Sequence, residues 1–195
     1  MTPNKIGITG GIGSGKSVVS AIFHTLGIPV YNCDEESKRL TVSHPVIREH
    51  LVHLVGPDVY QDNTLNKPYL ANYLFASAQH VQQVNGIIHP VLKDDFRQWA
   101  AKQASPIVAM ESAILFEAKF EDVVDRILMV YAPLEVRIAR AMQRDHATRE
   151  AIESRIRQQM DDEEKRVRSH FVIVNDGKTP VIPQVLDFIN MLSEK

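Results

Sequence analysis

The sequence of 195 residues contains one cysteine, no long apolar run and almost no excess of either charge. The single Cys33 excludes an intrachain disulfide and is typical of a reducing compartment. No apolar run is long enough to cross a bilayer, and a strand-like segment begins almost at once, so we expect neither a membrane span nor a signal peptide. These absences predict a cytoplasmic protein.

Charged residues are nearly balanced, with 22 Lys and Arg against 24 Asp and Glu. The resulting net charge of −2 argues against a general nucleic-acid binder. Repeats, low-complexity tracts and flexible linkers are also missing. Because 44% of the residues are hydrophobic, the chain can bury a full core without disulfides or metals. We therefore expect one globular α/β domain over residues 1–195.

The clearest motif present is a phosphate loop over residues 10–17, which matches the pattern G-x-x-x-x-G-K-[ST]. A strand-like segment, 6–9, precedes it, and apolar residues at helical spacing follow as far as Gly27. Backbone N–H groups and a helix N-terminus at such a loop bind phosphate, which makes a chance glycine turn a poor alternative. The predicted nucleotide-binding residues are Gly11, Ile12, Gly13, Ser14, Gly15, Lys16 and Ser17.

This loop also predicts how a nucleoside triphosphate is held. Lys16 can reach the β- and γ-phosphate oxygens, and the Ser17 hydroxyl can bind Mg²⁺. Strands are expected at 6–9, 28–31, 106–110, 126–131 and 171–174. Residues just past the carboxyl ends of parallel strands line the ligand crevice. Asp34 and Glu111 follow two of these strands, so Asp34 is expected near the loop and Glu111 near the metal or its water.

Two further regions are predicted to be helical. Residues 44–105 show helix-like spacing without a convincing strand and a break at Pro90, so we expect a helical insertion where a second substrate could dock. The helix over 134–145 carries Arg137, Arg140 and Arg144 on one stripe, which we expect to face outward as part of a mobile lid. A long polar helix over 148–168, with an exposed charge run at 161–166, should follow, and an amphipathic helix over 183–192 should end the chain.

The loop alone does not separate kinases, GTPase switches, motor ATPases and non-catalytic binders. A strand-end D-x-x-G and an N-K-x-D motif are missing, which weakens a GTPase, and the chain is short for a motor. A small-molecule kinase of the nucleoside-monophosphate-kinase type fits best. Two alternatives stay open: a kinase for another small hydroxylated metabolite or nucleotide, and an ATP-binding regulatory or assembly protein.

Segments spread over nearly the whole chain resemble the dephospho-CoA kinase family. They are 8–17, Asp34, 85–90 (Asn-Gly-Ile-Ile-His-Pro), 115–117 (Leu-Phe-Glu), 140–145, 158–160 and 174–177. The resemblance implies a P-loop kinase fold: a five-stranded parallel sheet flanked by helices, with a core of 1–43, 106–134 and 169–195. It also implies a helical substrate-binding insertion at 44–105 and a helical lid at 135–168.

The same resemblance implies ATP-dependent phosphorylation of the ribose 3′-hydroxyl of dephospho-CoA, the last step of coenzyme A synthesis. The enzyme would use ATP and Mg²⁺, bind neither nucleic acid nor membrane, and be a monomer or weak homo-oligomer. Asp34 would orient the 3′-hydroxyl and accept its proton, and Arg140 would clamp the phosphates. The remaining implied contacts are Thr9, His89 and Lys93 for dephospho-CoA, Arg144 for the phosphates and Asn175 near the adenine.

Three segments depart from the family pattern. Asn32-Cys33-Asp34 stands where an acid-Ala-Asp triplet is common, so only Asp34 of the two acids is present. Asn66-Lys67 replaces the usual Asp-Arg, and Glu111-Ser112-Ala113-Ile114 replaces an Asp-x-Pro-Leu-like segment. The assignment of Asp34 does not depend on any of these changes.

Overall fold

The computed structural model of the chain describes residues 3–193. It divides into two compact units, one formed by Met1–Tyr31 with Ala100–Lys195 and the other by Asn32–Trp99. Within the described residues, no helix has the length and apolar character needed to cross a membrane. The helical unit begins at Asn32 rather than at residue 44, because α2 (Cys33–Ser43) belongs to it.

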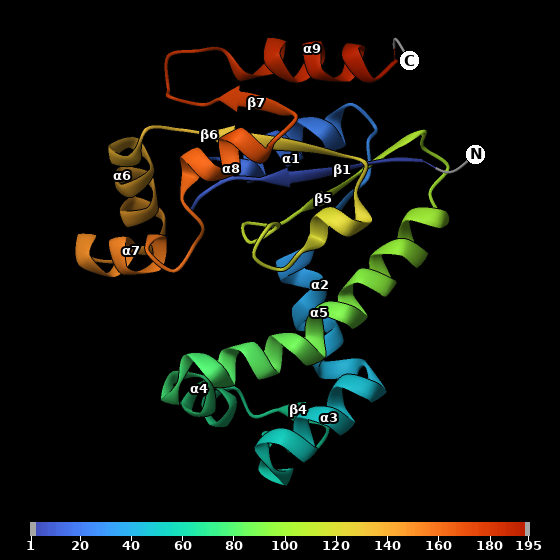
Figure 1. Cartoon of the computed structure of the whole chain (residues 1–195), viewed down its shortest axis with the longest axis vertical. Helices are drawn as coiled ribbons and strands as arrows, with labels where there is room; N and C mark the ends of the chain where they lie inside the picture. The colour runs from blue at the N-terminus through green and yellow to red at the C-terminus, as the bar shows by residue number, and fades with distance from the viewer. Residues whose placement is uncertain (1–2, 194–195) are drawn as a thin grey trace. The chain divides into compact units, whose positions relative to one another are not determined.

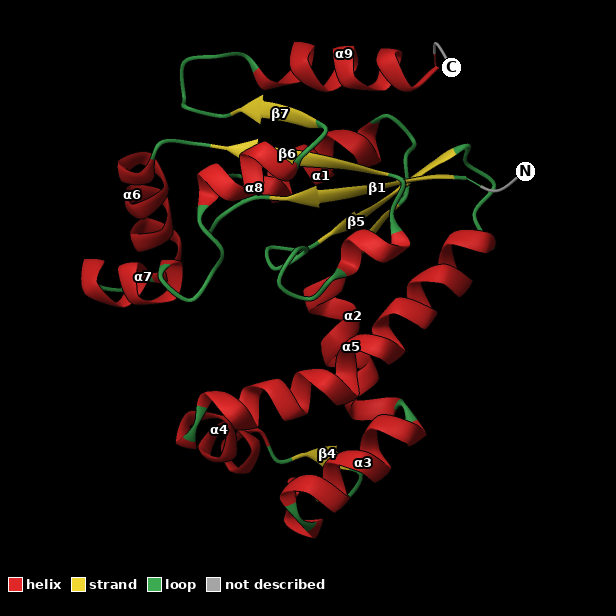
Figure 2. Cartoon of the chain, in the orientation of Figure 1, coloured by secondary structure: helices red, strands yellow, loops and turns green. Residues whose placement is uncertain are grey.

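The first unit is built on a five-stranded sheet in the order β2-β5-β1-β6-β7 (Figure 2). Its strands are β1 (Asn4–Thr9), β2 (Val30–Asn32), β5 (Ile107–Glu111), β6 (Arg126–Tyr131) and β7 (Phe171–Val174). Parallel pairing joins β1 to both β5 and β6, and β6 to β7. The predicted five-stranded parallel sheet is confirmed. Because β5 lies between β1 and β2, the strand before Asp34 is not adjacent to the strand before the phosphate loop.

Buried apolar side chains hold the phosphate loop against this sheet. Ile6 and Ile8 of β1 are fully buried, together with Val19 and Phe23 of α1 (Lys16–Thr25). They form one cluster with residues of β6, β7 and α9 (Val181–Ser193). Complete burial of such a side chain stabilises the fold by about 1.5–3 kcal/mol. Both elements that flank the loop are therefore anchored in the core.

Helices dominate the second unit, as the sequence predicts, but their limits differ. They are α2, α3 (Pro45–Val55), α4 (Lys67–Ala76) and α5 (Ala78–Ala101), with a 3₁₀ turn at Pro57–Val59. The predicted break at Pro90 is wrong, since α5 continues through it. Figure 1 shows α5 as one helix that changes direction partway along its length. A proline inside a helix removes one backbone hydrogen bond and bends the helix without ending it.

This unit also contains a strand pair that the sequence reading did not predict. Tyr60–Gln61 (β3) pairs antiparallel with Thr64–Leu65 (β4). The two residues between them, Asp62 and Asn63, have φ values of 47° and 64°. Positive φ at both central positions is the requirement of a type I′ hairpin turn, and Asp and Asn tolerate it better than most residues. Strands of two residues are too short to produce a visible alternation of apolar residues.

The predicted lid region consists of three helices. These are α6 (Leu134–Asp145), α7 (Arg149–Ile156) and α8 (Asp162–Arg168). Figure 1 shows α6 and α7 side by side, where Ile138, Ala141 and Ile152 form a small buried cluster. The predicted single helix over 148–168 is wrong. The Asp161 side chain accepts hydrogen bonds from the N–H groups of Glu163 and Glu164, and this N-cap starts a new helix.

Candidate active site

The phosphate loop connects β1 to α1 through glycines in conformations that other residues rarely adopt. Gly13 and Gly15 have φ values of 77° and 96°. The Lys16 ammonium lies over the loop, where it donates hydrogen bonds to the Gly10 carbonyl at 3.0 Å and the Gly11 carbonyl at 3.3 Å. A cation above a glycine loop at a helix N-terminus is an arrangement that binds a polyphosphate.

Asn175, at the end of β7, is brought to this loop as part of the site. Its side-chain amide donates to the Ser14 carbonyl at 2.8 Å, and its backbone N–H donates to the Tyr131 carbonyl at 2.8 Å. A Cβ atom at Gly15 would lie 2.1 Å from Asn175 Nδ2, so glycine at this position allows the amide to approach. Asn175 therefore fixes the shape of the phosphate loop.

The three arginines of α6 do not share one exposed stripe. Arg137 is only 4% exposed, so the prediction that all three face outward is wrong. Arg140 is half-buried and donates through Nη1 to the Asn175 carbonyl at 2.8 Å. Arg144 is exposed, and its Nε donates to Asp145 at 2.7 Å. Only Arg137 and Arg140 are therefore in contact with residues around the loop.

Arg137 forms a buried ion pair that the sequence reading missed. Its Nη2 lies 2.8 Å from Asp162 Oδ2, at the start of α8. Burial raises the pKa of Asp162, while the positive charges of Arg137, Lys165 and Lys16 act in the opposite direction. Asp162 thus lies within electrostatic range of the loop lysine as well as of Arg137. The expectation that residues 161–166 form an exposed charge run is wrong at this position, where the side chain is 18% exposed.

Gln159 places a second contact from the same segment on the loop. Its side-chain oxygen accepts the N–H of Ile12 at 3.1 Å. This amide belongs to the set that the motif predicts to bind phosphate. Residues 159–162 therefore reach the loop through both an amide oxygen and a carboxylate.

Lys165 also contradicts the prediction that residues 161–166 are exposed, because its side chain is fully buried. Its ammonium lies 3.0 Å from Glu117 Oε1 and donates to the Ala113 carbonyl at 2.9 Å. Glu117 also accepts the N–H of Met160 at 2.8 Å. These contacts attach α8 to the loop that follows β5.

The residues available for a divalent cation are oxygen donors. Ser17 lies in the first turn of α1, and Ser20, one turn further along, donates to Glu111 Oε2 at 2.6 Å. Among residues 3–193, no group of three or more His, Cys, Asp or Glu side chains could hold a metal alone. Mg²⁺ prefers oxygen and in kinases takes part of its coordination from substrate phosphates. The Ser17 hydroxyl and the nearby Glu111 carboxylate fit that chemistry.

Thr9 and Ser14 contribute buried hydroxyl groups at the loop. Both residues are fully buried, and neither Oγ atom has a hydrogen-bond partner among the described residues. Buried polar groups are normally paired, so such groups at a binding site need a functional or solvent explanation. Thr9 is one of the residues implied for dephospho-CoA.

In the second unit, Asp34 occupies the first turn of α2. Asn32 is the N-cap of this helix, and its side chain accepts the N–H groups of Asp34 and Glu35 at 3.0 and 3.2 Å. The helix therefore begins at Cys33, directly after this cap. Asn32, which departs from the family pattern, thus has a structural role, and the exposed Asp34 side chain is not used for capping.

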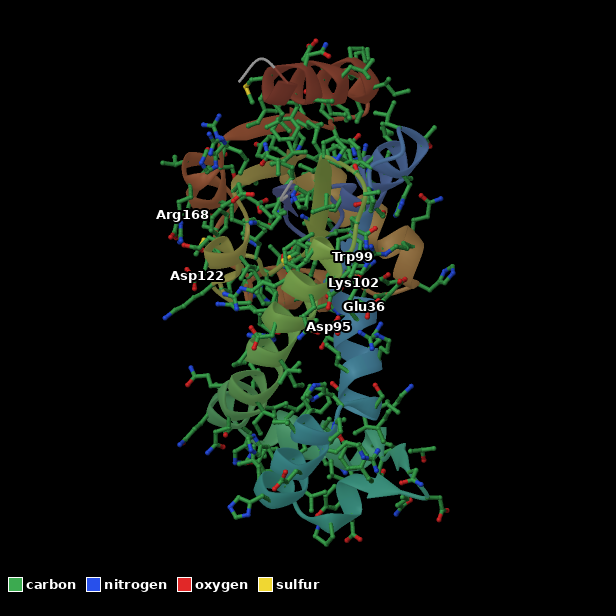
Figure 3. All side chains as sticks on the ribbon, turned by 90° about the vertical axis from the view of Figure 1, so that its right-hand side faces the viewer. Glu36, Asp95, Trp99, Lys102, Asp122 and Arg168 are labelled. Atoms are coloured by element: carbon green, nitrogen blue, oxygen red, sulfur yellow. The ribbon has the colours of Figure 1, made fainter. Side chains whose placement is uncertain are left out.

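His89 and Lys93 lie one turn apart on α5 and are both half-buried. Burial, assisted by the charge of Lys93, lowers the pKa of His89. His89 is therefore a neutral hydrogen-bonding group at physiological pH. In the same unit, Arg39 of α2 donates to Glu36 and, at 2.9 Å, to Asp95; Figure 3 labels these two acidic residues. The second contact connects α2 to α5.

Known proteins match this chain over nearly its full length. A family model described as dephospho-CoA kinase matches residues 4–180. The curated dephospho-CoA kinase of Bacteroides fragilis (strain YCH46) is 58% identical over 192 residues, which cover 98% of this chain and 94% of that protein. The corresponding protein of Porphyromonas gingivalis is 42% identical over 191 residues, with 97% and 95% covered.

Solved structures show the same fold. The crystal structure of TT1252 from Thermus thermophilus has a TM-score of 0.83 at 31% identity and covers 100% of this chain and 98% of its own. A dephospho-CoA kinase from Campylobacter jejuni has a TM-score of 0.67 at 21% identity, with 98% and 96% covered. A shikimate kinase from Bacteroides thetaiotaomicron, at 13% identity and a TM-score of 0.55, shares the fold alone.

Proposed function

The chain belongs to the dephospho-CoA kinase family, and we propose that it transfers the γ-phosphoryl group of ATP to the ribose 3′-hydroxyl of dephospho-CoA. The products are coenzyme A and ADP, so the reaction is the last step of coenzyme A synthesis. The observation that carries the proposal is the complete phosphate loop, with Lys16 over the Gly10 and Gly11 carbonyls, in a chain that matches the family from residue 4 to residue 180.

In the proposed reaction, the 3′-oxygen forms a bond to the γ-phosphorus while the bond to the β,γ-bridging oxygen breaks. The hydroxyl proton passes to the Asp34 carboxylate, and ADP leaves with the bridging oxygen. The transition state is loose, so charge collects on the transferring oxygens and the acceptor alcohol mainly needs to be positioned. Lys16 faces that charge, and Asp34 orients the alcohol.

The remaining assignments follow the family resemblance and the contacts of each residue. Arg140 stabilises the phosphates, and its contact with the Asn175 carbonyl holds it beside the phosphate loop. Arg144 assists from the exposed face of α6. Asn175 is assigned to the neighbourhood of the adenine, and its hydrogen bond to the Ser14 carbonyl, which holds it at the loop, supports this role. Thr9, His89 and Lys93 bind dephospho-CoA, His89 in its neutral form.

Ser17, with Glu111 through water, would hold Mg²⁺, which supplies neutralising charge and orientation for the triphosphate when bound. The single cysteine, Cys33, is buried and consistent with a reducing compartment, and we propose the cytoplasm as the location. A monomer or weak homo-oligomer remains the proposed assembly.

ADP release from Mg-ATP tests the function directly. We expect release to depend on dephospho-CoA and to be absent with a panel of nucleosides and sugars. Lys16→Met should abolish it. Equal release with another acceptor would favour a kinase for that metabolite. Slow hydrolysis that no acceptor stimulates would favour a regulatory ATP-binding protein.

A further inference from the structure

Arg137 has unused hydrogen-bonding capacity beside the phosphate loop. Its side chain is 5% exposed, and Nη2 forms an ion pair with Asp162. Nε and Nη1 are buried without a hydrogen-bond partner among the described residues. A guanidinium has five N–H donors, and those of a purely structural buried arginine are normally satisfied. The incomplete pairing indicates that an acceptor is missing.

The position of the unpaired nitrogens indicates where that acceptor would be. A Cβ atom at Gly11 would lie 1.6 Å from Nη1, so the guanidinium rests directly against the loop backbone. A Cβ atom at Gly13 would lie 2.2 Å from the Arg137 carbonyl oxygen, which shows equally close packing by the α6 backbone. The absence of side chains at Gly11 and Gly13 therefore allows Arg137 to lie directly against the loop.

Asp162 holds Arg137 close to Lys16, the lysine of the phosphate loop. Its Oδ2 accepts from Nη2, and the charge of Lys16 acts on the same carboxylate. Two cations thus lie near one carboxylate at the phosphate site, an arrangement suited to an incoming polyanion. Nε–H and Nη1–H lie on different edges of the planar guanidinium, so they can donate to two separate phosphate oxygens.

We propose that Arg137 is a phosphate-binding residue that donates Nε–H and Nη1–H to terminal phosphate oxygens of ATP while Asp162 holds Nη2. The inference rests on the proposed ATP-dependent transfer and adds a residue to its nucleotide site. Because both nitrogens are buried, the oxygens reach them only when residues 157–161 shift while Asp162 stays paired with Nη2. A cavity of about 430 Å³, lined by Arg137, Arg157, Gln159 and Asp162 among others, gives that segment room.

The test compares nucleotide affinities of the intact chain by calorimetry with Mg²⁺ present. Arg137→Met combined with Asp162→Asn removes both charges and leaves neither one buried alone, so folding is preserved more readily than in either single variant. We expect about a 10- to 100-fold loss of affinity for a non-hydrolysable ATP analogue and for ADP, since hydrogen bonds to charged groups are worth that much. AMP affinity should be unchanged.

Two further variants keep the result decisive. Arg137→Lys retains a charge for Asp162 but loses the planar fork, so it should still weaken binding of the ATP analogue several-fold. Glu163→Gln with Arg166→Met removes an exposed ion pair of the same helix and should bind all three nucleotides as the wild type does.

The proposal is overturned if either Arg137 variant binds the ATP analogue with wild-type affinity. It is also overturned if the affinity for AMP falls by the same factor, because that result would mean that the whole pocket is distorted. Binding is measured without an acceptor. If the wild type failed to phosphorylate dephospho-CoA, the proposed function would fail while the Arg137 result still stood.

Discussion

Lys165→Met removes the one ammonium that attaches α8 to the loop after β5. Lys165 is fully buried, 3.0 Å from Glu117 Oε1 and 2.9 Å from the Ala113 carbonyl. Methionine keeps an unbranched stem of similar length and removes the charge. The Ala113 carbonyl then loses its donor, and Glu117 loses its counter-ion.

The expected loss in the free energy of unfolding depends on how exposed each partner of the ion pair is. Breaking a buried ion pair by removing one partner costs roughly 3–5 kcal/mol. Here the Glu117 side chain is 24% exposed and still accepts the Met160 N–H at 2.8 Å, so part of its charge stays solvated and bonded. We therefore expect a loss of about 2–3 kcal/mol in the free energy of unfolding. For a chain of this size that lowers the Tm by about 4–12 °C.

Urea and thermal unfolding followed by circular dichroism measure this loss. Lys165→Met with Glu117→Gln should recover part of it, because no unpaired carboxylate remains. Arg166→Met, next in sequence and exposed, should stay within about 0.5 kcal/mol of the wild type. The reasoning is refuted if Lys165→Met is as stable as Arg166→Met, since that would mean the buried ammonium contributes nothing.

Three further predictions concern the reaction and its pH dependence. Asp34→Asn should reduce turnover by about 10²–10⁴-fold while ATP binding persists, and near-normal turnover would remove Asp34 from the mechanism. Arg140→Ala should reduce turnover by roughly 10³-fold or more; a change in Tm alone would make its contact with Asn175 purely structural. Folding lowers the pKa of His89, so below about pH 6.5 the unfolded chain binds a proton at this residue more readily than the folded chain does. The free energy of unfolding should therefore decrease as the pH falls below that value. His89→Gln should flatten the pH dependence of the Tm over that range, and an unchanged slope would show that His89 does not titrate there.

The parallel sheet was the most predictable part of the fold. Apolar runs such as 126–131 and 171–174 match β6 and β7 residue for residue. β6 lies inside the sheet and is mostly buried, whereas β7 is an edge strand that buries Ile173 in the core. Two helix starts also follow local chemistry: Asn66 and Thr148 are residue types favoured at N-caps, and their side chains accept the N–H groups of Tyr69 and Ala151. Local chemistry thus determined both results.

The errors arose where distant residues override a local pattern. Charged residues over 161–166 look like a solvated face, but Asp162 and Lys165 have partners in Arg137 and Glu117, which lie far away in the sequence. Only Asp161, a good N-cap, indicated locally that a helix begins there. Pro90 likewise bends α5 without ending it.

The candidate site was predictable where a motif specifies it. Residues 10–17 form the expected loop. Asn175 lies beside it, and its place near the adenine stays a prediction. Arg137 was misread because its spacing with Arg140 and Arg144 suggests one exposed stripe. The apolar Ala141, one turn further along the same face of α6 and only 1% exposed, was the available signal that this position could be buried.

The central claim is that this chain forms a phosphomonoester at one ribose oxygen. Phosphorus NMR of the product made from dephospho-CoA and Mg-ATP tests it most directly, with the 3′-deoxy analogue of dephospho-CoA as the second substrate. We predict one new 3′-phosphomonoester resonance in equal amount to ADP, and none with the 3′-deoxy analogue. Phosphate appearing at another position, or ADP forming equally with the 3′-deoxy analogue, would contradict the account.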